Sequence, residues 1–177
     1  MGFPMDKADL DSPESWRIAL HRPTNPAQFH SLHIPPMPRS RHFNENHFEI
    51  RPSPVPGAGM GLFSLAHILP NDTLGYYTGR VITDKQADCK PYIDSLYLLY
   101  ICKDHWVYGE GAEANYTRFI NHDGESPNAE LIVSTRWKTA RFNALREILP
   151  GEEIFFDYGP DYWDALGVTP NRVIRAA

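Results

Sequence analysis

Proline placement constrains this chain more than any other feature of its sequence. Ten of the sixteen prolines fall within residues 1–56, with clusters at 35–38 and 52–56. Proline cannot donate a backbone hydrogen bond, and it interrupts both helices and central strands. We therefore expect residues 1–47 to form an irregular, proline-rich N-terminal extension, an arm that lies partly on the surface of a folded domain.

Beyond the extension, the sequence changes to short strand-like runs separated by turn residues. The capping-box spacing at 83–86 predicts one short helix, and residues 160–166 predict a final helical turn. Many short strands with little helix indicate a compact, mostly β domain. We place this domain at residues 48–164, followed by a C-terminal tail at 165–177. No internal repeat is evident.

The charge of the chain is unevenly distributed. Residues 48–164 hold 17 acidic and 10 basic side chains, whereas residues 1–47 hold five of each. An acidic domain lacks the basic footprint of a duplex-DNA binder, so we expect no direct contact with nucleic acid. The charge favours a cationic partner, such as a protein tail rich in lysine and arginine. The excess of acidic side chains has a simpler explanation, which is that net charge keeps the surface of the domain soluble.

The hydropathy pattern bears on location. No apolar run approaches the ~18 residues that a membrane span needs. The first ten residues lack the basic and apolar pattern of a secretion signal. We expect a soluble intracellular protein without membrane contact.

The cysteines and histidines predict no metal site. Cys89 and Cys102 form no CxxC pair, which excludes a cysteine-based structural zinc site and a disulfide framework. His30 and His33 have a spacing that metal sites use, but no cysteine or helical frame lies near them.

Three short motifs could carry chemistry, and each also has a purely structural interpretation. The glycine-rich turn at 57–61 allows close approach of the backbone to a ligand, or it is an ordinary tight turn. Asn121 and His122 could bind the edge of a purine, or they satisfy backbone groups in a buried turn. The run Asp157-Tyr158-Gly159 places a phenol beside a flexible residue, or it buries a core tyrosine.

Taken in order, these stretches resemble the SET-domain family of protein lysine methyltransferases over about residues 48–163. The resemblance rests on five stretches: Gly59-Met60-Gly61-Leu62-Phe63, Tyr77-Thr78-Gly79-Arg80-Val81-Ile82, Tyr97-Leu98-Leu99-Tyr100, Arg118-Phe119-Ile120-Asn121-His122 with Pro127-Asn128, and Gly151 to Gly159. The chain departs from the family at Arg80, where glutamate is usual, and at 123–126, where Ser-Cys is usual. The cysteine-rich zinc modules that often flank such domains are not found on either side.

The resemblance implies a SET fold of short strands and small sheets, with a C-terminal pseudoknot and little helix. It implies an enzyme that transfers a methyl group from S-adenosyl-L-methionine to a lysine of a protein, with a basic histone-like tail as the expected substrate. The residues implied at the cofactor are Gly59, Met60, Gly61, Arg118, Phe119, Asn121, His122, Tyr162 and Trp163.

The resemblance also implies roles at the acceptor lysine. Tyr158 is expected at the methyl-transfer point, with Tyr77 and Tyr97 as walls of an aromatic channel. Phe156 is expected to set the product: a phenylalanine leaves room for added methyl groups, which predicts di- or trimethylation.

Two alternatives stay open. The first is a non-catalytic SET-like module that binds protein or chromatin, although this chain keeps both the Asn-His pair and the terminal tyrosine. The second is a SET methyltransferase that acts on a non-histone protein. We expect a nuclear or chromatin location if the source is eukaryotic or the target is host chromatin, and a cytoplasmic one otherwise.

Overall fold

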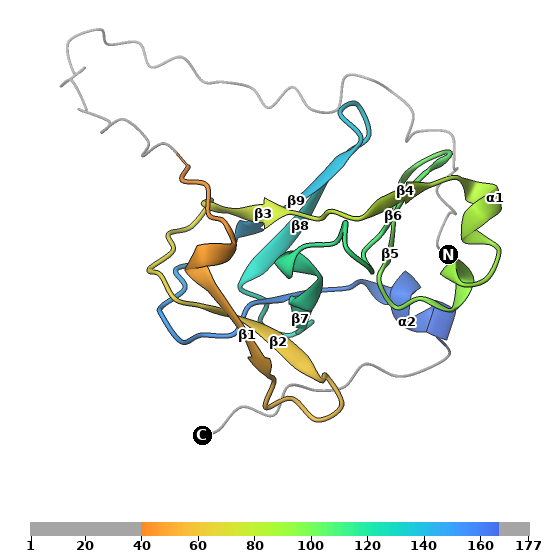
Figure 1. Ribbon diagram of the computed structural model, residues 1–177. Helices are drawn as coiled ribbons and strands as arrows, with labels where there is room; N and C mark the ends of the chain where they lie inside the picture. The colour runs from red at the N-terminus through yellow and green to blue at the C-terminus, as the bar shows by residue number, and fades with distance from the viewer. Residues whose placement is uncertain (1–39, 167–177) are drawn as a thin grey trace, which may run out of the picture. The chain divides into compact units, whose positions relative to one another are not determined.

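The computed structural model describes residues 40–166 (Figure 1). Most of the expected N-terminal extension and of the C-terminal tail therefore lies outside the described residues, as do His30 and His33. Within the described part, short strands dominate and helices are few. The expectation of a mostly β fold built from small sheets is confirmed.

The strands in the described residues form four small sheets. Three are antiparallel: β1 (Phe48–Pro52) with β2 (Met60–Ser64), β3 (Thr73–Tyr76) with β9 (Thr139–Ala144) and β8 (Ala129–Ser134), and β4 (Arg80–Ile82) with β6 (His105–Tyr108) and β5 (Leu98–Cys102). The fourth sheet pairs β7 (Asn121–His122) with β10 (Phe155–Phe156) in parallel.

The helices are short: α1 (Asp84–Ala87), α2 (Pro160–Leu166) and the 3-10 turns η2 (Glu45–His47), η3 (Tyr92–Asp94) and η4 (Tyr116–Phe119). Thr83 begins α1 as predicted, because its Oγ1 accepts from the Gln86 N–H while Gln86 Oε1 accepts from the Thr83 N–H. None of the helices within residues 40–166 is long and apolar enough to cross a membrane.

The parallel pair β7–β10 brings the chain, after β9, back beside the segment that precedes β8 (Figure 1). We call this crossing of β7 and β10 the knot. Asn121 lies opposite Phe155, and His122 lies opposite Phe156. The fully buried Asn128 holds the crossing, because its Nδ2 donates to the Glu153 carbonyl and its Oδ1 accepts from the Phe155 N–H, both at 2.8 Å. The second and third sequence motifs therefore meet, as the expected pseudoknot requires.

The core has two parts that meet beside the knot. Large buried side chains from separate segments of the chain form the main cluster, and those buried to 1% exposure or less are Leu62, Ile68, Leu74, Ile120, Phe142, Ile148 and Ile154. A smaller cluster joins Ile101 of β5, Val107 of β6 and Ala140 of β9. Tyr77 and Leu131 pack against both clusters, so these side chains connect them. Burying a large apolar side chain contributes about 1.5–3 kcal/mol.

A short internal repeat that was not predicted contributes Ile68 and Ile148 to the main core. Residues 65–72 and 145–152 share the pattern Leu-x-x-Ile-Leu-Pro, a turn residue and an acid. The two segments pair antiparallel at Ile68 and Ile148, whose backbones exchange hydrogen bonds of 3.0 Å in both directions. The expectation that the chain has no internal repeat is therefore wrong for this motif.

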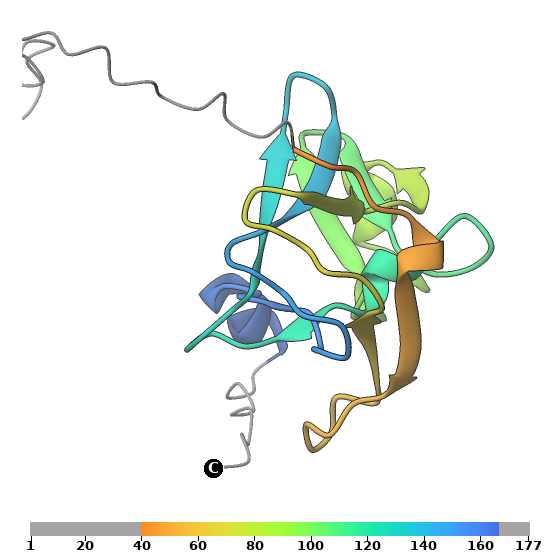
Figure 2. The same cartoon turned by 90° about the vertical axis from the view of Figure 1, so that its left-hand side faces the viewer.

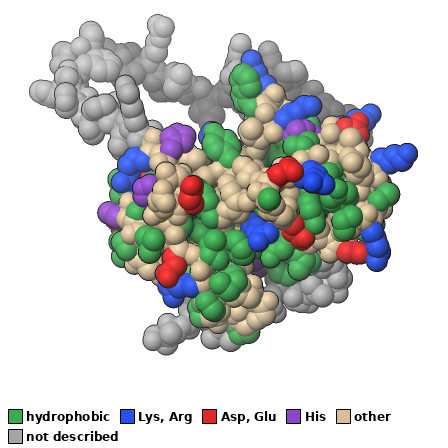
Figure 3. Space-filling view, in the orientation of Figure 1, with side chains coloured by type: hydrophobic (Ala, Val, Ile, Leu, Met, Phe, Trp, Pro, Cys, Tyr) green, Lys and Arg blue, Asp and Glu red, His purple; other side chains and the backbone are tan. Residues whose placement is uncertain are grey.

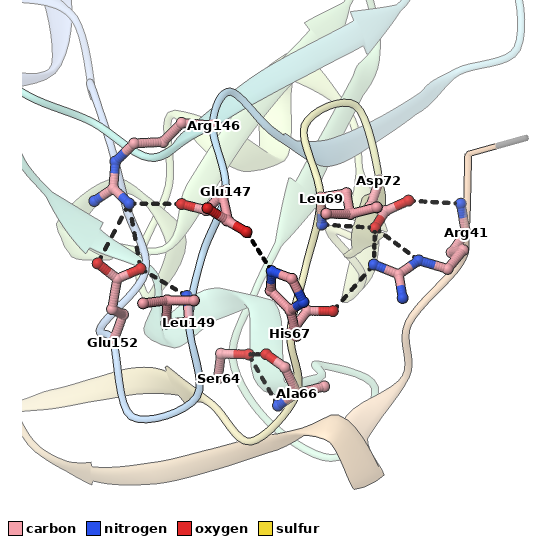
Figure 4. A network of polar contacts seen from close by, with 10 residues as sticks. All are labelled: Arg41, Ser64, Ala66, His67, Leu69, Asp72, Arg146, Glu147, Leu149 and Glu152. Atoms are coloured by element: carbon pink, nitrogen blue, oxygen red, sulfur yellow. Dashed lines mark hydrogen bonds and ion pairs between the residues drawn. The ribbon is translucent and has the colours of Figure 1, made fainter. Parts of the chain in front are cut away.

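The two copies end in equivalent turns (Figure 4). In the first, the Asp72 carboxylate accepts from the Leu69 N–H at 2.9 Å; in the second, the Glu152 carboxylate accepts from the Leu149 N–H at 2.8 Å. An arginine also pairs with the acid in each copy, Arg41 with Asp72 and Arg146 with Glu152. These turns anchor the starts of β3 and of the segment that leads to β10.

Part of the expected N-terminal extension packs on the domain. His42 forms a parallel bridge with Thr73, which adds a short stretch of chain to the edge of β3 (Figure 2). The Arg41 guanidinium donates to the Asp72 carboxylate and to the His67 carbonyl. Although burial opposes ionisation, these bonds lower the pKa of Asp72 below its ordinary value of 3.8.

Candidate active site

A cavity of about 330 Å³ lies where β2, η4, β7, β10 and α2 come together. Its walls include eleven of the residues singled out from the sequence: Met60, Tyr77, Tyr97, Arg118, Phe119, Asn121, His122, Phe156, Tyr158, Tyr162 and Trp163. Further apolar walls come from Leu98 and Leu99, which lie in the quoted motif that begins at Tyr97, and from four residues outside the motifs: Val55, Leu96, Leu131 and Phe142. The volume lies at the lower end of the range for small-molecule sites.

Two of the predicted residues do not line this cavity. Gly61 lies against the carboxylate of Glu153, where a Cβ atom would collide, and the same Cβ would lie 3.2 Å from Asn121 Nδ2. Gly59 has φ +72° and faces open space. Gly61 therefore permits close packing against Glu153, and Gly59 permits a left-handed turn.

Glu153 was not singled out from the sequence, yet it organises one wall. Its Oε1 accepts from Asn121 Nδ2 at 2.8 Å, and its Oε2 accepts from Ser53 Oγ at 3.0 Å. The amide of Asn121 also donates to the Met60 carbonyl at 3.1 Å. Burial raises the pKa of Glu153 above its ordinary value of 4.5, although both hydrogen bonds act in the other direction. The acid pair Glu152–Glu153, which precedes β10, was the only signal in the sequence.

Tyr158 lies in a cage of aromatic rings. Its ring centroid is 4.7 Å from those of Phe156 and Tyr162, and it stacks on Trp163 at 5.9 Å. The hydroxyl donates to the Ile120 carbonyl at 2.9 Å. Burial raises the pKa of Tyr158 far above its ordinary value of 10.0, and neighbouring tyrosines add to the effect. The phenol therefore stays protonated at physiological pH.

Tyr77 and Tyr97 are joined to each other. The Tyr77 hydroxyl donates to the Tyr97 carbonyl at 2.8 Å, and the Gly109 N–H donates to the same oxygen at 2.8 Å. Burial raises the pKa of Tyr77 well above its ordinary value. Gly109 passes directly against the Tyr77 ring, where a side chain would collide. The two tyrosines therefore form one fixed wall.

His122 connects the knot to α2. Its Nδ1 accepts from the Tyr158 N–H at 3.1 Å, and its ring contacts Trp163 edge-on at 4.8 Å. Burial lowers the pKa of His122 below its ordinary value of 6.5, although Asp157 and Asp123 act in the opposite direction. The ring is therefore neutral near pH 7 and carries its proton on Nε2.

Arg118 presents a cation in the wall of the cavity. Its guanidinium lies over the rings of Phe119 at 4.6 Å and Tyr97 at 5.6 Å, and donates to the Gly109 carbonyl at 3.4 Å. Among residues 40–166, no carboxylate forms an ion pair with it. Such a cation is suited to an anionic group of a ligand.

Trp163 adds a buried donor, its Nε1–H, that has no hydrogen-bond partner among the described residues. Buried donors are normally satisfied, so a ligand oxygen or nitrogen would suit this position. No cluster of three or more metal-binding side chains occurs among the described residues.

A second cavity, of about 340 Å³, shares Leu131, Phe156 and Tyr158 with the first. Its other walls are Pro127, Ala129, Glu130, Leu145 and Asp157. Phe156 and Tyr158 therefore line both hollows.

The fold is a mostly β domain with a parallel crossing of β7 and β10, and an aromatic cavity lies beside that crossing. The SET domain family model matches residues 59–159, which is more than half of the chain. The chain belongs to the SET domain family.

The relatives include histone-lysine N-methyltransferases. Human histone-lysine N-methyltransferase EHMT1 is 32% identical over 120 residues, covering 62% of this chain and 9% of its own length. The histone-lysine N-methyltransferase MEDEA of Arabidopsis thaliana is 33% identical over 114 residues, covering 60% of this chain and 16% of its own length. The aligned region thus spans less than a fifth of either relative.

Proposed function

We propose that this domain is an S-adenosyl-L-methionine-dependent protein lysine N-methyltransferase. The observation that carries the proposal is the protonated phenol of Tyr158, which borders both cavities inside an aromatic cage. The SET family match and the histone-lysine relatives support the same reaction.

The residues of the first cavity fit the cofactor. The guanidinium of Arg118 suits its carboxylate, and the rings of Tyr158, Tyr162 and Trp163 suit a sulfonium cation. The unpartnered Trp163 N–H and the Asn121–His122 backbone offer polar contacts to its adenine end. When bound, the cofactor supplies an activated methyl group. Gly59 and Gly61 support this cavity from outside, through the turn and through Glu153.

The acceptor lysine must lose a proton before it can attack. A free lysine has a pKa of about 10.4, and an apolar, aromatic channel lowers that value because it disfavours the ammonium form. Tyr77 and Tyr97 supply such walls. The Tyr158 hydroxyl donates its hydrogen bond to the Ile120 carbonyl, so its oxygen lone pairs are free to orient the amine. Its role is positioning rather than proton abstraction.

The net negative charge of residues 48–164 bears on the substrate, and Phe156 bears on the degree of methylation. We propose a lysine-rich protein tail as substrate, since residues 48–164 are acidic and both relatives are histone-lysine enzymes. A histone tail as target would be consistent with action at chromatin. Phe156 carries no hydroxyl that would hold a blocking water, which supports di- or trimethylation.

The first test is methyl transfer from labelled S-adenosyl-L-methionine to core histones and to a cell lysate, with mass spectrometry of the labelled bands. Tyr158→Phe removes the hydroxyl and is expected to lower transfer by about 10²-fold or more, the size of a lost preorganised contact. Tyr100→Phe is the matched control, because Tyr100 is half exposed and lines neither cavity.

The outcomes separate the alternatives. Label on a histone that depends on Tyr158 supports the proposal, and label on another protein retains the chemistry but moves the target away from histones. Absence of label together with absence of cofactor binding in a titration would favour a non-catalytic interaction module.

A further inference from the structure

The β8–β9 hairpin ends in an exposed tryptophan. In both views of the ribbon, its tip projects beyond the neighbouring strands of the domain (Figures 1 and 2). Trp137 in the connecting loop is 71% exposed, more than any other large apolar side chain that the structure describes. The indole belongs to neither core cluster of the described residues, and tryptophan is among the commonest anchors of protein interfaces.

The tip is preorganised. Ser134 pairs with Thr139 at the end of the ladder, and the Ser134 Oγ accepts from the Trp137 N–H at 3.3 Å. Lys138 closes the loop in the left-handed region, at φ +51°. The Arg136 guanidinium lies 5.0 Å from the centroid of the indole. An ordered loop loses little conformational entropy when it binds, which favours a docking role.

Charge separates this hairpin from the rest of the domain. The hairpin, residues 129–144, holds three of the ten basic side chains of residues 48–164 and one of the 17 acidic ones. Two of the three bases, Arg136 and Lys138, flank Trp137 directly in the loop, and the one acid, Glu130, lies at the far end of β8. Figure 3 shows Lys and Arg side chains next to hydrophobic ones over this end of the molecule. A cationic, aromatic tip on an acidic domain is complementary to an anionic partner.

We propose that the tip of the β8–β9 hairpin, residues 134–139, docks on an acidic protein surface that carries an apolar pocket. Trp137 would fill the pocket while Arg136 and Lys138 pair with carboxylates at its rim, the arrangement of a hot spot. A protein patch fits better than nucleic acid, because a long polyanion would extend from the tip over an otherwise acidic domain.

The probe is a fluorescein-labelled random copolymer of glutamate and tyrosine, which combines carboxylates with apolar groups. Binding to the full chain is followed by fluorescence anisotropy at low ionic strength. Trp137→Ala and the double variant Arg136→Ala/Lys138→Ala are each expected to weaken binding about tenfold or more. Lys85→Ala and Leu149→Ala are matched controls with an exposed charge and an exposed apolar side chain elsewhere, and they should bind as the wild type does.

Four results would overturn the proposal: unchanged binding of Trp137→Ala, equal binding of polyglutamate without tyrosine, tighter Trp137-dependent binding of a single-stranded oligothymidylate, or Trp137-dependent self-association in sedimentation velocity. The last two would assign the tip to nucleic acid or to a second copy of the chain. Thermal melting of each variant verifies folding. The test requires no methyl transfer, so its outcome is independent of the proposed activity.

Discussion

At the scale of single residues, two nearby glycines, Gly59 in the turn and Gly61 in β2, serve different purposes. A Cβ on Gly61 would enter the space of the Glu153 carboxylate and disturb its hydrogen bond with Asn121, whereas a Cβ on Gly59 would meet nothing but would strain a left-handed backbone. The crowding at Gly61 involves buried polar groups, which tolerate little displacement.

We therefore expect Gly61→Ala to lower the free energy of unfolding by about 2–4 kcal/mol, since overpacking and a broken buried hydrogen bond add together. Gly59→Ala should cost about 1 kcal/mol from backbone strain alone. Urea denaturation of both variants measures the difference. Equal losses would contradict the close contact between Gly61 and Glu153.

Phe156 is the residue at which product specificity can be tested. Its ring lies 4.7 Å from that of Tyr158 and 4.9 Å from that of Phe142, and it borders both cavities. Phe156→Tyr adds a hydroxyl to this space and is expected to shift the product toward monomethyl-lysine. A tenfold change in the ratio of tri- to monomethyl product corresponds to about 1.4 kcal/mol.

Mass spectrometry of the methylated peptide counts the methyl groups. Phe155→Tyr is the matched control, because Phe155 is the neighbouring residue and lines neither cavity. An unchanged product ratio in Phe156→Tyr would remove this residue from product control.

At the scale of elements, the paired repeat at 65–72 and 145–152 supports the knot. Ile68 and Ile148 are fully buried, whereas Leu149, the next residue along, is 52% exposed. Their bridge holds the turns that lead into β3 and toward β10, so packing at the repeat affects the position of both cavity walls.

Ile148→Ala is expected to lower the free energy of unfolding by about 2–5 kcal/mol, because it removes a fully buried side chain and leaves a cavity. Leu149→Ala should change it by less than about 1 kcal/mol, since the side chain is half exposed. Thermal and urea melts compare the two variants. A large loss in Leu149→Ala would show that the exposed face of the repeat is covered.

At the scale of the whole molecule, one histidine couples stability to pH. The folded state lowers the pKa of His122 below 6.5, so between that value and the lower folded pKa the unfolded chain binds more protons. The contribution of the neutral ring is fully present above pH 6.5. It is lost as the pH falls through the folded pKa, despite the opposing pull of Asp157 and Asp123.

We expect the free energy of unfolding to decrease as the pH falls below 6.5, and the slope to flatten in His122→Gln. His42→Gln is the control, because the His42 side chain is exposed and lies outside both cavities. Urea melts at a series of pH values measure the slope. An unchanged slope in His122→Gln would mean that the ring is not held in its neutral form.

Much of this molecule can be predicted from the sequence, because local rules govern it. The capping box of α1, the range of α2 and the predominance of short strands follow from turn residues, proline positions and alternating apolar runs. The cavity walls Asn121, His122 and Tyr158 lie in motifs whose order and spacing mark the family. By contrast, no local rule indicates that the carboxylate of Glu153 packs against Gly61 and accepts a hydrogen bond from Asn121.

The sequence by itself determined the type of fold, the family and most of the residues that meet at the cavity. Only the tertiary structure decided that Phe156 and Tyr158 border two cavities, that Arg118 lacks an ion-pair partner among residues 40–166, and that Trp137 projects from the domain. The physical reason is range. Turn and strand preferences act over a few residues, whereas burial, ion pairing and exposure depend on groups that only the parallel crossing of β7 and β10 and the packing of separate sheets bring together.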